Sequence, residues 1–266
     1  MSVLYIVAIA VCFLASLLGP LCGIGGGVII KPVIDALGIM PVAAVSFLSS
    51  MSVLTMALAT LVQNAAGRTS TINVRSMLPI ALGSAVGGVC GKALFNRLSA
   101  MFVHVELVGA VQEAVLVALS VLVLVYTLNK GRMRPFDIQG VASRAVVGFV
   151  AGACWSFLGI GGGPFNLAIL SLFFSMDSKP AAQASLFIIA FSQTASLFYT
   201  IATGSVPRVS LSVLAGMCAA AVAGSVVGRT LVRRMDSAAV DRLYRLALVL
   251  IIALSSYNVM RFCGLV

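Results

Sequence analysis

The chain carries one glycine cluster twice, about half its length apart. Gly23-Ile24-Gly25-Gly26-Gly27 lies in the first half and Gly159-Ile160-Gly161-Gly162-Gly163 in the second. Each cluster lies inside an apolar run, where glycine is a poor helix former, so each predicts a break in a helix. A helix that begins at such a break offers free N–H groups and a partial positive charge. Paired breaks of this kind point to a transporter's substrate site, and their chemistry predicts a small anion.

Polar residues near the two clusters could complete this pocket. Lys31 follows the first cluster by one turn and could attract the anion, or it could pair with Asp35 one turn further on. Asn166 follows the second cluster and could donate its amide to an oxyanion or to a helix cap. Hydroxyl and amide groups suit an oxyanion, although each could instead bond between helices. The candidate substrate-binding residues are Gly25, Gly26, Gly27, Lys31, Ser46, Ser49, Ser50, Gly161, Gly162, Gly163, Asn166, Ser185 and Gln193.

One acidic residue lies within a spanning segment. Glu113 falls inside the apolar run 105–128, where an ionisable group is costly and is a functional hypothesis by default. It could carry a coupling proton, and it has no acidic counterpart in the second half. The six cysteines are scattered without a paired spacing, and His104 is the one histidine. We therefore expect no metal site, no cofactor and no enzymatic activity.

Composition assigns the chain to the membrane. Of the 266 residues, 61% are hydrophobic and only 9% are charged, whereas a soluble domain has about 25% charged residues. The net charge of +10 could suggest nucleic acid in a soluble protein. Here the basic residues lie mostly between apolar runs, so orientation in the bilayer explains them better. No nucleic-acid partner is expected.

The apolar runs predict an all-α polytopic membrane protein. The runs of spanning length are 2–22, 39–62, 77–95, 105–128, 143–158, 181–203, 209–228 and 240–262. Two shorter apolar pieces, 28–39 and 164–175, follow the glycine clusters. The expected fold is therefore eight full spans plus two short helices, with one glycine-broken helix in each half.

The two halves of the chain are internal repeats. We expect a first repeat over 1–128, a cytoplasmic basic linker over 129–144 and a second repeat over 145–266. The glycine clusters align at a shift of 136 residues, and a stripe of small residues aligns at a shift of 137. The stripe is Gly83, Gly87 and Gly91 in the first half, and Ala220, Gly224 and Gly228 in the second. Such stripes let helices approach closely. The glycine clusters could likewise serve only to let helices pack closely. Their duplication in register favours instead the interpretation as a paired substrate site.

The basic residues choose between two topologies. If each short piece passes back through the membrane, each half makes five passes. The loops after 62, 128 and 228 then share one side with the loop that holds Lys179, and most basic residues lie there. If the short pieces are re-entrant and each half makes four crossings, the basic residues divide almost evenly. The positive-inside rule favours five passes. An odd number predicts inverted repeats, with both termini outside a bacterial inner membrane.

The glycine clusters and their surroundings resemble the TauE/SafE family of membrane permeases. The resemblance is carried by Gly23-Ile-Gly-Gly-Gly-Val-Ile-Ile-Lys-Pro32 and by Gly159-Ile-Gly-Gly-Gly-Pro-Phe-Asn166. The small-residue segments Ala43-Ala-Val-Ser46 and Ala182-Gln-Ala-Ser185 also resemble the family pattern, and the likeness covers nearly the whole chain. That family is associated with the movement of sulfite and organosulfonates.

The resemblance implies an anion such as sulfite, a sulfonate or a sulfo-carboxylate as substrate. The two clusters differ in one respect, because Pro164 directly follows the second whereas Val28 follows the first. We therefore do not expect the two half-sites to be chemically equivalent.

These observations favour a secondary carrier that works by alternating access. No nucleotide-binding motif is present, so the energy is expected from gradients, with a proton or sodium as the coupling ion. The other expected partners are the small anionic substrate, the lipid bilayer and a second copy in a homo-oligomer. The alternatives are an anion channel, a non-transporting membrane subunit, and a membrane-embedded enzyme or thiol-redox protein.

Overall fold

The structure is a computed structural model that describes residues 3–23, 25–101, 105–130, 132–232 and 235–265. Ten helices make up the described part of the chain, which contains no strand, so the expected all-α fold is confirmed. The helices are α1 Val3–Cys22, α2 Gly27–Leu37, α3 Val42–Ala66, α4 Val74–Met101, α5 Val105–Asn129, α6 Val141–Leu158, α7 Gly163–Phe174, α8 Ser178–Ala202, α9 Leu211–Val232 and α10 Ser237–Phe262.

Seven of these helices are long and apolar enough to cross a membrane: α3, α4, α5, α6, α8, α9 and α10. The expected eighth span is α1, whose described apolar part, Tyr5–Pro20, is shorter than a full span. The two expected short helices are α2, with 11 residues, and α7, with 12. At about 1.5 Å per residue, each is long enough to reach only about half way through a bilayer core.

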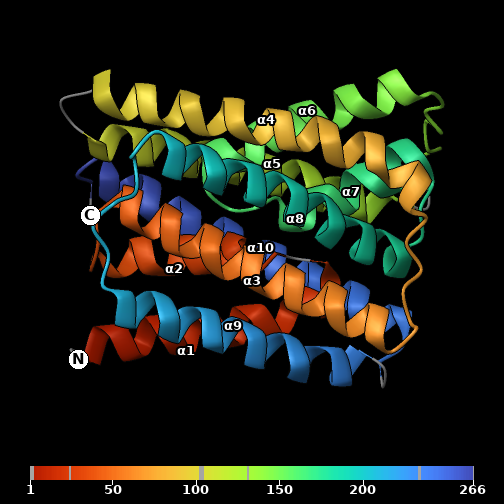
Figure 1. Ribbon diagram of the computed structural model, residues 1–266, viewed down its shortest axis with the longest axis horizontal. Coiled ribbons are helices and arrows are strands. Elements are labelled where there is room, and N and C mark those ends of the chain that lie inside the picture. Colours follow the sequence, from red (N-terminus) through yellow and green to blue (C-terminus); the bar gives the residue numbers. More distant parts are fainter. Residues whose placement is uncertain (1–2, 24, 102–104, 131, 233–234, 266) are drawn as a thin grey trace.

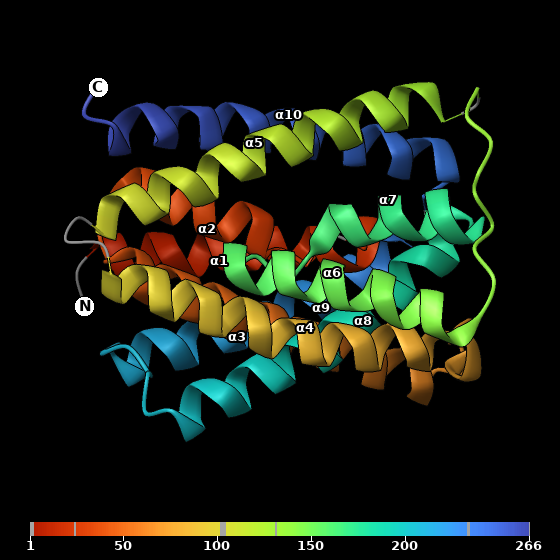
Figure 2. The same ribbon diagram turned by 90° about the horizontal axis from the view of Figure 1, so that it is seen from above.

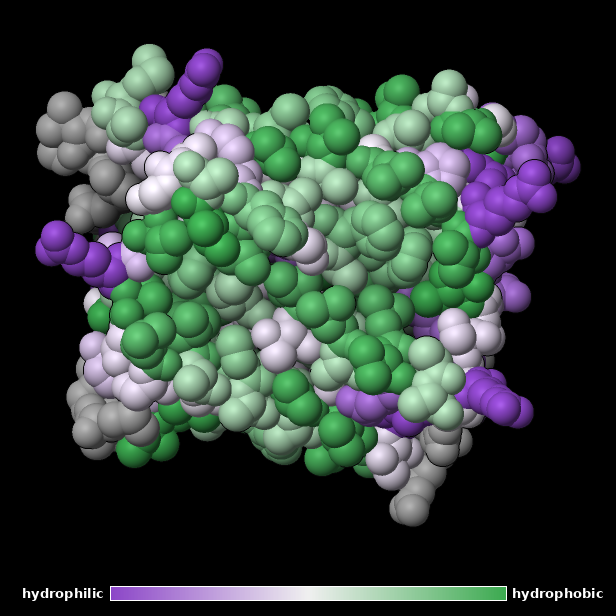
Figure 3. All heavy atoms as spheres, in the orientation of Figure 1, coloured by the Kyte–Doolittle hydropathy of each residue, from purple (hydrophilic) through white to green (hydrophobic). Residues whose placement is uncertain are grey.

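The surface has the character of a membrane-spanning bundle. Apolar side chains cover the middle of the face seen in Figure 3, and hydrophilic residues gather at its two ends. Many large apolar side chains are exposed on the long helices, among them Leu14, Leu82, Phe198, Leu246 and Val249. An exposed apolar belt of this kind suits lipid rather than water.

The helices run roughly along one axis, and the loops gather at its two ends (Figures 1 and 2). The loops 67–73, 132–140 and 175–177 lie at one end, which we call the linker end. The start of α1 and the end of α10 lie at the other, the terminal end. This is the grouping of loops that the five-pass arrangement predicts.

Each short helix returns toward the end from which the helix before it comes. The end of α2 lies at the terminal end, where a Cβ on Gly38 would overlap the guanidinium of Arg261 in α10. The end of α7 lies at the linker end, where the Phe136 N–H donates to the carbonyl of Leu172 at 2.8 Å. Both glycine clusters therefore lie at the inner turns of helix pairs inside the bundle.

The halves of the chain interleave. The first helix of each half packs against the fourth helix of the other: α1 against α9, and α6 against α4. The small-residue stripes make these contacts, because a Cβ at Gly87 would overlap the carbonyl of Phe149, and one at Gly224 would lie 2.5 Å from the carbonyl of Phe13. The predicted role of the stripes in close helix packing is confirmed.

Candidate functional site

The two glycine clusters meet in the interior. A Cβ built on Gly25 would lie 3.6 Å from the backbone nitrogen of Gly163, and one on Gly27 would lie 2.6 Å from the carbonyl oxygen of Ile160. Gly26 and Gly162 precede the first residues of α2 and α7 with φ of 64° and 97°, a region that only glycine enters at low cost. Neither helix start is capped by a side chain. The starts of α2 and α7 therefore lie together, with their partial positive charges.

Predicted serines support each cluster from the long helices. Ser185 of α8 donates to the carbonyl of Gly23 at 3.2 Å, and Ser49 of α3 donates to the carbonyl of Gly27 at 3.4 Å. Ser46 of α3 packs against Gly159, and its buried hydroxyl has no hydrogen-bond partner among the described residues. Ser46 and Ser185 thus each contact the cluster of the other half, and each helps to position it.

Two amides at the second cluster have free donors. The indole of Trp155 donates to the Asn166 oxygen at 2.7 Å, which orients this side chain. The Asn166 Nδ2 and the Gln193 Nε2 are buried and find no acceptor in the part of the chain that is described. Gln193 Nε2 lies 3.7 Å from the Cβ position of Gly161. Because buried donors are normally satisfied, these two amides are positioned to donate to a bound water or ligand.

A narrow polar cavity of about 10 Å³, room for about one water molecule, adjoins the second cluster between α3, α4, α6 and α8. Its central residue is Lys92 of α4, which is 8% exposed. Its ammonium lies 4.9 Å from the centre of the Phe95 ring and pairs with no carboxylate among the described residues. We call this space the Lys92 cavity, and its polar lining is Ser50, Lys92, Ser156, Gln193, Ser196 and Thr200.

The Lys92 cavity brings together two predicted residues, Ser50 and Gln193, and one that the sequence analysis missed. Lys92 lies near the end of the apolar run 77–95, and a lysine at such a position is usually assigned to the loop that follows a span. A usable signal was present, since Lys92 directly follows Gly91 of the small-residue stripe. A residue at that position belongs to a packed helix, and a charge there faces protein rather than water.

A second cavity has a basic residue at the equivalent position. Arg229 follows Gly228 as Lys92 follows Gly91, and the shift from 92 to 229 is the stripe's own 137 residues. Arg229 donates to the Asn64 oxygen and to the Thr69 hydroxyl, each at 3.0 Å. The polar lining of this Arg229 cavity is Thr60, Asn64, Lys179, Gln183 and Arg229.

The two cavities lie toward opposite ends of the bundle. Both contact α8, but the Arg229 cavity contacts Lys179 near its start and the Lys92 cavity contacts Thr200 near its end. The start of α8 is at the linker end and its end is at the terminal end. The glycine clusters, which pack against Val53 and Ile189 in the middle of α3 and α8, lie between them.

Lys31 and Glu113 lie in a separate cluster. The Lys31 ammonium is 2.8 Å from the Asp35 carboxylate and 3.0 Å from the Glu113 carboxylate, and all three side chains are at most 1% exposed. Of the two possibilities left open for Lys31, the structure shows the ion pair with Asp35. It adds Glu113, which lies 82 residues further along the chain. We call these residues the Lys31 triad.

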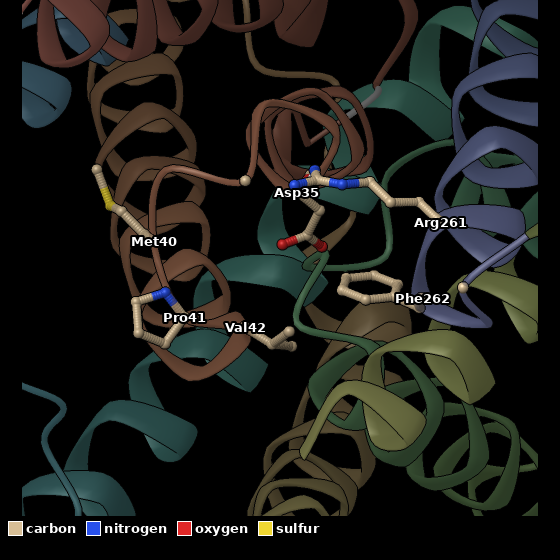
Figure 4. Close-up of a pocket in the computed structure, with 8 residues that line it drawn as sticks. Asp35, Met40, Pro41, Val42, Arg261 and Phe262 are labelled. Carbon is tan, nitrogen blue, oxygen red and sulfur yellow. The ribbon is translucent and has the colours of Figure 1, made fainter. Parts of the chain in front are cut away.

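The triad reaches a cavity at the terminal end. This cavity has a volume of about 480 Å³, and Asp35, Arg261 and Phe262 line it (Figure 4). The Arg261 guanidinium donates to the backbone carbonyls of Asp35 and Ala36, each at 2.7 Å. We call it the Asp35 vestibule. Figure 4 shows the Asp35 carboxylate within it, between Met40 and Phe262.

No group of three or more histidine, cysteine or acidic side chains that could hold a metal ion occurs among the described residues. The fold and the site thus define a multi-pass α-helical membrane protein whose polar groups converge on paired, interrupted helices.

The model of one protein family, described as "Sulfite exporter TauE/SafE", matches residues 8–257. The chain therefore belongs to the TauE/SafE family, whose members are membrane transporters rather than enzymes. Neither a curated protein nor a solved structure matches the chain significantly.

Proposed function

We propose that the protein is a secondary transporter of a small anion, most specifically sulfite, an organosulfonate or a sulfo-carboxylate. The observation that carries the proposal is the Lys92 cavity, which combines a largely buried lysine without a carboxylate partner and an amide donor without an acceptor among the described residues. A buried charge is costly unless it is paired. Once the surrounding helices move apart and widen the cavity beyond about 10 Å³, an anion supplies both missing partners at once.

The donors suit the oxygens of a sulfur oxyanion. Lys92 offers a charged donor, Gln193 offers an amide and Ser156 offers a hydroxyl, whereas Ser196 already donates to the carbonyl of Gly88 at 3.1 Å. Hydrogen bonds between a charged donor and an anion are about twice as strong as neutral ones. The substrate-binding set that we propose keeps the predicted glycines, Ser46, Ser49, Ser50, Asn166, Ser185 and Gln193, and adds Lys92.

The interleaved halves support transport by alternating access. In this mechanism the first and second repeats are inverted, and the Lys92 and Arg229 cavities are access sites from opposite sides. The exchange of helix partners between halves, and the equivalent positions of Lys92 and Arg229, favour this arrangement. The anion passes the paired glycine clusters between the two cavities. The positive-inside rule makes the linker end cytoplasmic in a bacterial inner membrane, with both termini outside.

The test is transport by full-length protein in liposomes, with sulfite, taurine, isethionate and sulfoacetate as substrates. Lys92→Met is expected to raise the half-saturation concentration by at least about tenfold, because a hydrogen bond to a charged group contributes about 1.5–3 kcal/mol. Lys130→Met is the matched control, because Lys130 is exposed at the end of α5.

Three outcomes contradict the proposal. Wild-type transport by Lys92→Met removes the Lys92 cavity as the binding site. Flux that does not saturate with substrate indicates a channel. The absence of both flux and a thermal shift with all four anions indicates a subunit that does not transport them.

A further inference from the structure

The Lys31 triad contains more negative than positive charge. Lys31 contributes one positive charge, and Asp35 and Glu113 contribute two carboxylates, all buried. A buried net charge inside a membrane protein is costly, so a further positive charge is needed to balance the site. The end of α2 adds further negative potential at the triad, because Asp35 lies in the last turn of this helix, where the helix dipole is negative.

Two carboxylate oxygens of the triad lack a partner. Asp35 Oδ1 and Glu113 Oε2 are buried and have no hydrogen-bond partner in the described part of the chain. Their companion oxygens, Asp35 Oδ2 and Glu113 Oε1, both contact the Lys31 ammonium. The open oxygens are therefore the atoms at which a proton would bind.

The surroundings of the triad favour a proton over a metal cation. The Lys31 ammonium already lies between the two carboxylates, where a sodium ion would have to be coordinated. Arg261 of α10 is a further charged residue beside the triad. Its guanidinium donates to the backbone carbonyls of Asp35 and Ala36 and not to a carboxylate oxygen in the described part of the chain. The other helices that pack against α2, which are α1, α3 and α7, contain no charged residue.

The triad is connected both to water and to the proposed substrate site. Both carboxylates are buried, but Asp35 lines the vestibule and Glu113 does not, so a proton from the terminal end reaches the triad at Asp35. Lys31 lies only one turn after Gly27, the residue at which α2 meets the second half. A change in the pairing of Lys31 therefore acts on the same 11-residue helix that carries the first glycine cluster.

We propose that the Lys31 triad is a proton-binding site that couples proton movement to the transport of the anion. A hydronium ion in the vestibule transfers its proton to a carboxylate oxygen, an O–H bond forms, and water remains. Lys31 is then paired with a single carboxylate, which frees α2 to move relative to α5. The second half has no such site, because Leu167 and Ser171 stand at the positions of Lys31 and Asp35 after the 136-residue shift.

The experiment rests on the proposed anion transport and separates two activities of the protein in liposomes. Exchange of labelled sulfite or isethionate against the same internal anion requires binding and alternation without net proton movement. Accumulation driven by an acidic exterior requires coupling. With one proton for each isethionate, one pH unit supports about tenfold accumulation, and the membrane potential has no effect because no net charge moves.

Glu113→Gln and Asp35→Asn are expected to retain exchange within about twofold and to lose the whole of the about tenfold accumulation that one pH unit supports. Asp137→Asn, in the exposed linker, is the control and retains both activities. Accumulation by Glu113→Gln equal to wild type overturns the proposal. So does accumulation that follows a sodium gradient and ignores the pH gradient.

A second measurement does not depend on the folding of the variants. A pH-sensitive dye inside liposomes that contain wild-type protein should report acidification when isethionate is taken up. Net uptake of isethionate by the wild-type protein without acidification overturns the coupling proposal alone. The absence of any wild-type exchange contradicts the proposed function itself, so the two failures are distinguishable.

Discussion

Lys31 and Lys92 are two buried lysines of the same half of the chain in opposite electrostatic surroundings. Lys31 has two carboxylates within 3.0 Å of its ammonium. Lys92 has an aromatic ring, hydroxyls and a free amide around it, and no carboxylate partner among the residues that the structure describes. The difference teaches that the counter-ions of a buried lysine, rather than its burial, decide what it can bind.

The comparison assigns different tasks to the two sites. The Lys31 triad already has an excess of negative charge, so it repels an anion and attracts a proton. The Lys92 cavity has an excess of positive charge, so it attracts an anion. A transporter that couples the two ions needs both kinds of site, and the two sites that we propose lie on separate helices, α2 and α4.

Removal of the Lys31 charge is expected to have the largest effect on stability. Lys31→Met leaves two buried carboxylates without a cation, which should lower the free energy of unfolding by about 3–5 kcal/mol. Lys92→Met removes an unpaired buried charge and should not lower the free energy of unfolding. Thermal unfolding of purified protein without substrate measures both. Equal losses would mean that the two lysines are not electrostatically different.

A second substitution at the triad sharpens the comparison. Adding Glu113→Gln to Lys31→Met removes one of the stranded carboxylates, so we expect a coupling energy of about 1–3 kcal/mol between the two changes. A double-mutant cycle by chemical unfolding gives this value. The matched cycle of Lys92→Met with Glu113→Gln should be additive, and coupling there would show that the two sites are not independent.

Gly162 tests whether the Lys92 cavity depends on the adjoining glycine cluster. Its φ is 97°, and a Cβ there would lie 2.5 Å from the Trp155 ring and 2.8 Å from Asn166 Nδ2. Gly162→Leu should lower the exchange rate at least about tenfold, since such strain costs about 1–3 kcal/mol. Gly204, with φ of 62° and no atom within 4 Å, is the control. Similar losses in both variants would assign the effect to backbone strain alone.

The smallest expected effect belongs to the neutral donor of the Lys92 cavity. Gln193→Leu removes one amide hydrogen bond, so the half-saturation concentration should rise about fivefold, corresponding to about 1 kcal/mol. Initial rates over a range of substrate concentrations measure it. A larger loss than in Lys92→Met would make the amide, rather than the charge, the main anion contact.

Much of the helical arrangement could be predicted from the sequence. The short helices expected at 28–39 and 164–175 are Gly27–Leu37 and Gly163–Phe174 in the structure. Such helix boundaries can be predicted from the sequence, because hydropathy, glycine and proline determine the local conformation of the residues around them. The eighth span was less predictable, because the apolar run 2–22 turns inside the bundle at the first glycine cluster.

The candidate site was predicted less completely. Ser50 and Gln193 were named from their positions after the short helices, and both line the Lys92 cavity. Lys92 itself was missed, because hydropathy places a charge near the end of an apolar run in a loop. The choice between anion attraction and ion pairing at Lys31 stayed open, because local spacing supplied only Asp35.

By itself, the sequence determined the all-α membrane fold, the two glycine clusters between helices and the stripes along which helices pack, since all of these depend on residues that are close along the chain. Only the tertiary structure decided which lysine is neutralised. Glu113 reaches Lys31 across 82 residues, and Gln193 joins Lys92 from the other half of the chain. Electrostatic character depends on contacts made through space, and these exist only once helices that are far apart along the chain pack together.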